Sequence, residues 1–259
     1  MEQKNPVMIR FEHVTKSLGG RVVLDDLDFS IARGETFVIV GSSGVGKSVT
    51  LKHMVRLLTP DSGRIFVEDA CVSEAAGKPL EHIREQFGYL FQSGALLAWL
   101  TVFENVALPL REKTTMGEKE IQDRVMQVLG LVGLETEGGK VPSEISGGMR
   151  KRAGLARAIV RQPEIVLYDE PTSGLDPVTS RTIDALIEKL RVELGVTSVV
   201  VTHDLQSALT IGTRIAMLQG HLQELCTPAE FVRSQQPEVK EFLESQFITR
   251  KGVWERNLS

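Results

Sequence analysis

One short segment constrains this chain more than any other: a glycine-rich turn between an apolar run and a stretch with helical spacing. Residues 36–40, Thr-Phe-Val-Ile-Val, are typical of a buried strand, and apolar residues at 51, 54, 55 and 58 mark one helix face. The turn, residues 41–48, reads GSSGVGKS and fits G-x-x-x-x-G-K-[ST]. Glycines let several backbone N–H groups converge on one anion, and the following helix start adds positive potential. The segment predicts an α/β fold in which phosphate binds in the turn between a strand of the sheet and the start of a helix.

The side chains of this turn suit a nucleoside triphosphate. We expect Lys47 to reach the β- and γ-phosphates and the Ser48 hydroxyl to ligate Mg²⁺. The phosphate contacts are expected from Gly41, Ser42, Ser43, Gly44, Val45, Gly46, Lys47, Ser48 and Val49.

A second apolar strand ends in two carboxylates. Residues 165–168 read Ile-Val-Leu-Tyr, and Asp169 and Glu170 follow. Such a strand delivers Asp169 to the sheet edge beside the phosphate loop, where it would hold Mg²⁺ through water. Glu170 is then positioned to polarise an attacking water.

The order of patterns predicts an interrupted α/β core. Residues 7–14 and 27–31 alternate apolar and polar side chains, as half-buried strands do. Residues 164–168 and 198–201 are short continuous apolar runs, and an apolar helix face lies between them. Such runs indicate a parallel sheet covered on both faces. Between residues 94 and 161 the patterns are helical, with no convincing strand, so an all-helical insertion is expected.

Composition narrows the class of protein. Lys plus Arg total 30 and Asp plus Glu total 34, for a net charge of −4, which disfavours binding to a nucleic-acid backbone. Cys71 and Cys226 stand alone, so we expect no disulfide framework and a reducing compartment. Residues 1–10 lack the apolar core of a signal peptide. The most apolar stretch, residues 93–110, contains Glu104, Asn105 and Pro109 and is too short to span a membrane.

A third segment, residues 146–149, reads Ser-Gly-Gly-Met just ahead of a predicted helix. A serine followed by two glycines at a helix start is another anion site built from backbone N–H groups. The segment resembles the signature motif of ATP-binding-cassette (ABC) ATPases, and the resemblance covers residues 7–245. It implies a homodimer in which Ser146, Gly147 and Gly148 of one subunit close over the ATP bound by the other subunit's phosphate loop.

Three further motifs follow the order of that family. Gln92 matches the Q-loop glutamine, residues 173–176 match the D-loop, and His203 matches the switch histidine near the γ-phosphate. The resemblance implies ATP and Mg²⁺ as ligands. It implies a catalytic set of Lys47, Gln92, Glu170 and His203, and a metal set of Ser48, Gln92 and Asp169.

Three positions depart from the family pattern. The aromatic residue that stacks on adenine falls at Leu18, so apolar packing by Leu18 or Val23 is expected to replace it. Val49 stands where many relatives carry Ser or Thr, which leaves its backbone N–H but removes a side-chain contact. Met149 replaces the usual signature Gln and leaves the Ser and Gly contacts intact.

The resemblance also implies the architecture of one ABC cassette. Its fold class is α/β, a P-loop NTPase of the RecA-like type with an antiparallel β subdomain and an inserted α-helical subdomain. Residues 1–92 and 162–246 are assigned to the nucleotide-binding core, including the N-terminal β subdomain. Residues 93–161 form the helical subdomain, and residues 247–259 form a C-terminal tail, expected to be extended.

A narrower resemblance rests on residues 46–49, 91–97, 104–112 and 146–152. Together they look like the ATPase of Mla/Mce-type systems, which move phospholipid or other hydrophobic molecules across the bacterial envelope. This resemblance implies a membrane permease, an MCE-domain substrate-binding protein and a STAS-domain protein as partners. It implies a peripheral location on the cytoplasmic side of the inner membrane.

Two other functions belong to the same fold. One is the ATPase of an importer for amino acids or another polar solute. The other is a non-transport ABC protein of DNA repair or translation, which usually carries a coiled coil, zinc modules or two cassettes. This chain has one cassette and no such insertion, which favours transport.

Two further segments admit functional and structural interpretations. Residues 95–100, ALLAWL, are either a docking patch for a partner or part of the core of the helical insertion. A basic run is expected to form a solvated helix face, with contact to anionic lipid as the alternative; it comprises Arg150, Lys151, Arg152, Arg157 and Arg161.

Overall fold

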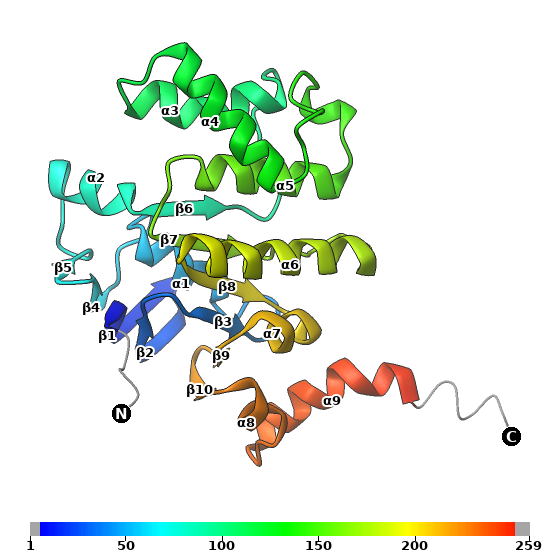
Figure 1. Ribbon diagram of the computed structural model, residues 1–259. Helices are drawn as coiled ribbons and strands as arrows, with labels where there is room; N and C mark the ends of the chain where they lie inside the picture. Colours follow the sequence, from blue (N-terminus) through cyan, green and yellow to red (C-terminus); the bar gives the residue numbers. More distant parts are fainter. Residues whose placement is uncertain (1–5, 252–259) are drawn as a thin grey trace, which may run out of the picture.

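The computed structural model describes the backbone of residues 6–251 and the side chains of residues 6–246. Its centre is a six-stranded sheet in the order β10-β9-β3-β8-β7-β6 (Figure 1). Five strands are parallel: β3 (Thr36–Val40), β6 (Phe87–Leu90), β7 (Ile165–Asp169), β8 (Thr197–Thr202) and β9 (Arg214–Gln219). The sixth, β10 (His221–Cys226), pairs antiparallel with β9. The three strands predicted at 36–40, 164–168 and 198–201 are confirmed as β3, β7 and β8.

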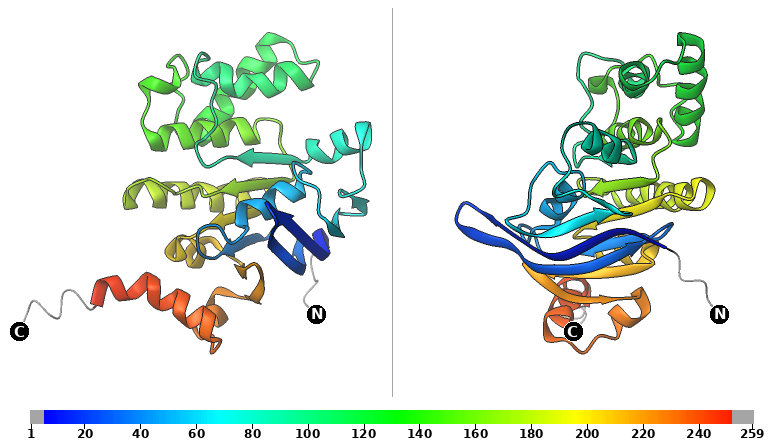
Figure 2. Two further views of the ribbon diagram at one scale, coloured as in Figure 1. Left: turned by 180° about the vertical axis from the view of Figure 1, so that it is seen from behind. Right: turned by 90° about the vertical axis from the view of Figure 1, so that its left-hand side faces the viewer.

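A second, antiparallel sheet packs beside the first. Its order is β2 (Arg21–Ala32), β1 (Val7–Leu18), β4 (Ser62–Val67) and β5 (Ala70–Cys71). Figure 2 shows β1 and β2 as one long hairpin. The rings of Phe11 and Phe29 stack at 4.6 Å, and Phe29 stacks on Phe37 of β3 at 5.3 Å. This aromatic stack joins the two sheets in one core.

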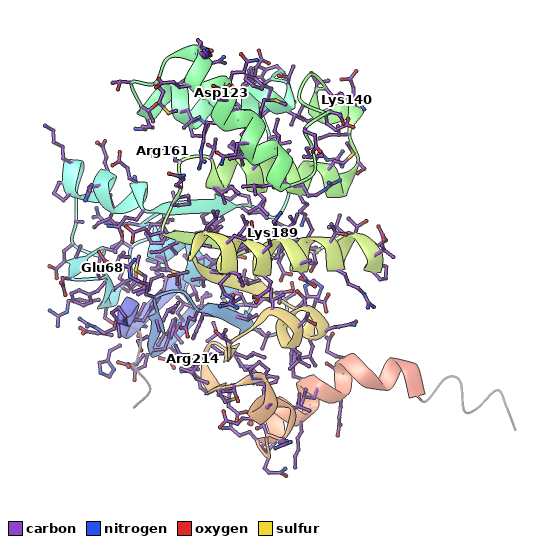
Figure 3. All side chains as sticks on the ribbon, viewed as in Figure 1. Glu68, Asp123, Lys140, Arg161, Lys189 and Arg214 are labelled. Atoms are coloured by element: carbon purple, nitrogen blue, oxygen red, sulfur yellow. The ribbon has the colours of Figure 1, made fainter. Side chains whose placement is uncertain are left out.

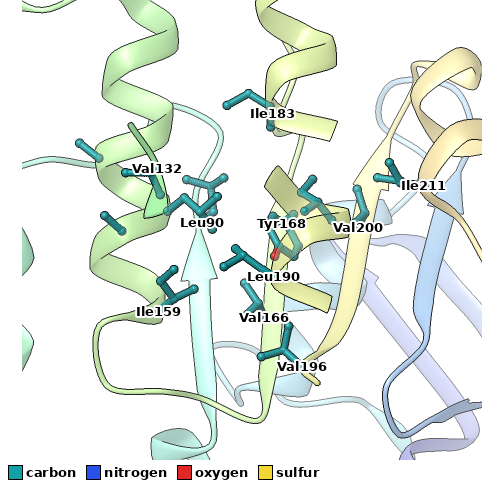
Figure 4. Packing of buried hydrophobic residues seen from close by; sticks show 14 of the residues in the cluster. Leu90, Val132, Ile159, Val166, Tyr168, Ile183, Leu190, Val196, Val200 and Ile211 are labelled. Carbon is teal, nitrogen blue, oxygen red and sulfur yellow. The ribbon is translucent and has the colours of Figure 1, made fainter. Parts of the chain in front are cut away.

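Strands β3, β7 and β8 are buried along their whole length because helices or a sheet cover both faces of the central sheet. Phe37 and Ile39 belong to the cluster that includes the second sheet and α1 (Lys47–Met54), whereas Val38 and Val40 belong to the opposite cluster. On that side lie α6 (Pro177–Leu194) and α7 (Leu205–Ile211). Figure 4 shows the strand residues Val166, Tyr168 and Val200 close to the helix residues Ile183 and Leu190.

Between β6 and β7 the chain is helical, as predicted. It forms α3 (Val102–Lys113), α4 (Glu118–Leu131), a 3₁₀ turn (Pro142–Glu144) and α5 (Gly147–Ile159). These helices form a group of their own above the sheets in Figure 1, whereas α2 (Gly77–Glu85) precedes β6. An apolar stripe along α4 is buried and continues to Val132 just after the helix; on α4 it consists of Ile121, Val125, Val128 and Leu129. The predicted unit boundaries after residues 92 and 161 fall in the connections on either side of this group.

The C-terminal segment contains α8 (Pro228–Val232) and α9 (Pro237–Lys251), at the end of the molecule away from the helical insertion (Figures 1 and 2). The expectation of an extended tail from residue 247 is wrong as far as Lys251, because α9 continues to that residue. Val239 and Phe242 anchor this helix in the core. Residues 252–259 lie outside the described part of the chain. No helix among the described residues is long and apolar enough to cross a membrane.

Candidate nucleotide-binding and catalytic site

The phosphate loop connects β3 to α1, and its glycines are required by its backbone. Gly41, Gly44 and Gly46 have φ values of 151°, 85° and 104°. A Cβ at Gly41 would lie 2.4 Å from the Leu218 carbonyl oxygen, and a Cβ at Gly46 would lie 2.7 Å from Leu24 Cδ2. The left-handed backbone and the crowding both exclude a larger residue. The loop is thus curled tightly against the core.

Lys47 lies inside this loop. Its side chain is only 6% exposed, and its ammonium donates to the carbonyl oxygens of Gly41 (2.8 Å) and Ser42 (3.0 Å). The carboxylate of Glu170 lies 3.6 Å away. Burial lowers the Lys47 pKa, and the negative charges of Glu170 and Asp169 oppose that shift. The structure therefore holds a cation beside the predicted water-polarising carboxylate.

The predicted metal residues Ser48 and Asp169 are in direct contact. The Ser48 hydroxyl donates to Asp169 Oδ1 at 2.6 Å, and the Tyr89 hydroxyl lies 3.4 Å from Asp169 Oδ2. These are oxygen donors, which Mg²⁺ prefers. Nowhere in the described chain do three or more His, Cys, Asp or Glu side chains gather to hold a metal ion. This sparse oxygen set fits Mg²⁺, which is usually bound by few protein groups together with substrate phosphates.

Glu170 and His203 also meet. The Glu170 carboxylate is 12% exposed and accepts a 2.8 Å hydrogen bond from His203 Nδ1. The Glu170 backbone has a φ of 49°, which is uncommon for a residue with a side chain. Its N–H donates to the Val201 carbonyl at the end of β8, two residues before His203. Adjacent parallel strands thus bring the predicted base and the predicted switch histidine together.

Gln92 is not part of this cluster. It is exposed, and its amide nitrogen lies 3.5 Å from the Ser173 hydroxyl in the segment that matches the D-loop. Among the hydrogen bonds of the described residues, none joins Gln92 to Ser48 or Asp169. Its roles in catalysis and in metal binding remain predictions.

The segment that resembles the signature motif starts α5. The Ser146 hydroxyl accepts a hydrogen bond from the Met149 N–H at 3.2 Å and thereby caps the helix. A Cβ at Gly148 would lie 2.4 Å from Thr179 Cγ2 in α6, whereas Gly147 has ordinary space around it. Within the described residues, no hydrogen bond joins residues 146–149 to the phosphate loop. The two predicted anion-binding loops are therefore not joined by a hydrogen bond within the described chain.

The residues expected near adenine lie on the β1–β2 hairpin. Leu18 ends β1 and is 40% exposed. Val23 is closer to the phosphate loop, since its carbonyl oxygen would lie 2.9 Å from a Cβ placed on Gly46. Val49 follows Ser48 in α1, and its carbonyl accepts from His53 Nδ1 at 2.7 Å.

The interpretation of the basic run as a solvated helix face is wrong for several of its members. Lys151 is 5% exposed, and its ammonium donates to the Glu170 carbonyl oxygen at 2.7 Å. Arg157 donates to the carbonyls of residues 94 and 95, and Arg152 donates to those of residues 132 and 133. Arg161, labelled in Figure 3, lies 3.5 Å from Glu85 of α2. The positive charges mostly satisfy buried or terminal carbonyls, which charge counting alone does not indicate.

Residues 95–100 are partly packed on the core and partly exposed, and their interpretation as a docking patch stays a prediction. Leu96 packs against the core of the helical insertion, whereas Trp99 is 76% exposed. The buried side chain of Asn105 holds this loop, accepting from the Leu97 N–H and donating to the carbonyls of Leu97, Leu100 and Thr101. A large apolar ring is thus presented on a braced loop.

Comparison with known proteins identifies the family. The model of the ABC transporter family matches residues 24–173. This chain belongs to the ABC transporter ATP-binding family. The chain is 42% identical over 250 residues to a probable ribonucleotide transport ATP-binding protein of Mycobacterium tuberculosis (strain H37Rv), covering 96% of this chain and 70% of that protein. It is 36% identical over 245 residues to the intermembrane phospholipid transport system ATP-binding protein MlaF of Escherichia coli K12, covering 94% and 91%.

A solved relative extends the comparison to structure. A dimeric ATP-binding cassette in a post-hydrolysis state, bound to ADP and Pi, matches with a TM-score of 0.78 and 33% identity, over 85% of this chain and 99% of that one. The predicted P-loop NTPase fold and the predicted ABC family are confirmed. The protein is an ATP-binding cassette that hydrolyses ATP.

Proposed function

We propose that this cassette powers a transporter that moves phospholipid, or another hydrophobic molecule, across the bacterial envelope. The observation that carries the proposal is the similarity to MlaF along almost its full length. That relative is the ATP-binding protein of an intermembrane phospholipid transport system.

The contacts around Glu170 support the following catalytic roles. Lys47 supplies positive charge to the β- and γ-phosphates of ATP. Glu170 orients and polarises the attacking water, and His203 holds the Glu170 carboxylate from its other side at 2.8 Å. Mg²⁺, held by Ser48 and Asp169 with Gln92 as a further ligand, would neutralise charge on the phosphates when bound.

The working unit is a homodimer with composite sites. Phosphate groups would be bound by residues 41–49 of one subunit and by Ser146, Gly147 and Gly148 of the other. The separation of the two loops within one chain supports this arrangement, because a head-to-tail pair makes both sites equivalent around a two-fold axis. The solved relative, described as a dimer, supports it too.

We infer that the dimer docks on the cytoplasmic side of the inner membrane against a permease, with an MCE-domain protein and a STAS-domain protein in the same complex. The exposed ring of Trp99 is the proposed anchor for the permease. No contact with nucleic acid is proposed.

A polar cargo is the second candidate. The mycobacterial relative is named for ribonucleotide transport, and its identity to this chain is higher than that of MlaF. The cargo is tested by purifying the complex from native membranes and identifying bound molecules by mass spectrometry. Phospholipid that copurifies and stimulates ATP hydrolysis supports the first proposal. Stimulation by a ribonucleotide or an amino acid, and not by lipid, rejects it.

The catalytic assignment is tested by Glu170→Gln, which preserves shape and removes charge. We expect hydrolysis to fall by about a hundredfold or more while ATP still binds and a closed ATP-bound dimer accumulates. Near-normal turnover in the assembled transporter would reject the role of Glu170.

A further inference from the structure

A buried lysine links the signature helix to the catalytic carboxylate. Lys151 lies on α5, five residues after Ser146, and its side chain is almost fully buried. Its ammonium donates to the backbone carbonyl oxygen of Glu170 at 2.7 Å. The contact therefore joins the helical insertion to the residue that follows β7, 19 positions along the chain.

The Glu170 peptide needs such a contact. Its φ of 49° lies in the left-handed region, where a side chain costs free energy unless surrounding groups fix the backbone. The Glu170 N–H donates to Val201, and its carbonyl accepts from the Ser173 N–H at 3.2 Å as well as from Lys151. Val201 and Ser173 belong to the core, whereas Lys151 comes from the helical insertion.

The charges around Lys151 strengthen this bond. Burial lowers the Lys151 pKa to about 8, while the negative charges of Glu170 and Asp169 favour the protonated amine. A hydrogen bond from an ammonium to a carbonyl in a dry environment is stronger than one between neutral groups. The carbonyl and the two carboxylates thus offset the desolvation of the Lys151 ammonium only in part.

We propose that Lys151 is a positioning residue that fixes the Glu170 peptide, so that the Glu170 carboxylate stays beside His203 and Lys47 only while the signature helix is seated on the core. Packing of α5 on the core and alignment of the Glu170 carboxylate then occur together. This inference rests on the proposed role of Glu170 as the water-polarising residue.

The test compares Lys151→Met, which removes the ammonium and keeps the length, with Lys151→Arg, which keeps a charged donor. Lys119→Met, at an exposed lysine of α4, is the matched control. In the full-length protein we expect Lys151→Met to lower kcat about tenfold or more, with KM and ATP affinity within about twofold of the wild type. Lys151→Arg should recover most of the lost kcat, and Lys119→Met should change nothing.

A double variant separates positioning from a general structural role. In the Glu170→Gln background, Lys151→Met should cause little further loss, because it acts through the missing carboxylate. A full multiplicative loss would overturn the proposal, as would wild-type kcat in Lys151→Met. So would equal loss in Lys151→Met and Lys151→Arg.

Melting temperatures show whether each variant is folded, and Lys151→Gln replaces Lys151→Met in the same comparison if the latter is not. The two levels of the proposal fail differently. If Glu170→Gln hydrolyses ATP like the wild type, the catalytic assignment fails. If Glu170→Gln is impaired while the Lys151 variants behave like the wild type, the Lys151 inference alone fails.

Discussion

The phosphate loop and the signature loop are both rich in glycine, but their glycines serve different purposes. In the phosphate loop, Gly41 and Gly46 are required by positive φ angles and by contacts with the surrounding core. In the signature loop, Gly148 is required because α6 approaches closely through Thr179, whereas a Cβ at Gly147 would meet only ordinary van der Waals contacts. The first loop encloses its own cation, Lys47, whereas the second contains none. In the proposed dimer the first loop is a site within one chain, and the second is half of a site shared with the partner.

The largest effect should come from removing the Lys47 ammonium from the phosphate loop. Lys47→Ala removes the buried ammonium from the phosphate site, so ATP hydrolysis should fall by at least about a hundredfold and ATP should bind more weakly. Steady-state hydrolysis and equilibrium binding of a fluorescent ATP analogue measure the two effects. Hydrolysis within a few-fold of the wild type would show that the phosphate loop does not depend on Lys47.

A substitution in the signature loop should affect ATP hydrolysis and ATP binding to different extents. Ser146→Arg should block hydrolysis to a similar extent but leave ATP binding at the phosphate loop within a few-fold, because the altered loop belongs to the partner's site. A mixed dimer of one Ser146→Arg subunit and one Lys47→Ala subunit concentrates both changes in one composite site. It should bind ATP at the intact site. Full hydrolysis by isolated monomers, independent of protein concentration, would exclude composite sites.

Within the signature loop, the two glycines should differ in kind. Gly148→Ala forces a methyl group against Thr179 Cγ2 and should lower the free energy of unfolding by about 1–3 kcal/mol. Thr179→Ser removes that methyl group, keeps the hydroxyl that donates to Asp176, and should restore most of the loss.

Gly147→Ala is the matched contrast, since its Cβ meets only ordinary contacts. It should melt at or above the wild-type temperature while hydrolysis falls, because the loop must approach a phosphate closely. Chemical denaturation and ATPase assays check both variants. Equal destabilisation by the two alanines would contradict the assignment of separate purposes.

The smallest effect should concern recognition of the adenine ring of ATP. Leu18 cannot stack on adenine as an aromatic ring does, so about 1–3 kcal/mol of stacking is missing, by analogy with bases bound on aromatic side chains. GTP should therefore compete with ATP better than in relatives that carry the ring, and Leu18→Tyr should restore preference for ATP. Competition binding measures this. A strong ATP preference that survives both Leu18→Ala and Val23→Ala would mean that recognition lies elsewhere.

Elements with one dominant signal could be predicted from the sequence. β3, β7 and β8 are continuous apolar runs because both of their faces are covered, and the glycine-rich turn defines the phosphate loop. β6 carries no such signal, because Gly88 interrupts it; a Cβ there would lie 2.4 Å from the Ala158 carbonyl oxygen. β10 lies at the sheet edge and is mostly half-buried, so its pattern is weak.

The candidate site likewise contains residues that the sequence marks and residues that it does not. Local motifs predict Lys47, Ser48, Asp169 and Glu170. Lys151 was hidden in a basic run, since its partner is a backbone carbonyl that no sequence pattern marks. Its burial depends on how the helical insertion packs on the core, which is a tertiary property.

The bracing of residues 97–101 by Asn105 has a consequence for assembly. The buried Asn105 amide fixes the loop that carries Trp99, because it accepts from the Leu97 N–H and donates to nearby backbone carbonyls. A partner that receives the indole ring therefore does not have to order this backbone, and less conformational entropy is lost on association. A rigid loop also passes on a displacement without first deforming. In the proposed transporter, a movement of the helical insertion during the ATP cycle would therefore displace the permease directly.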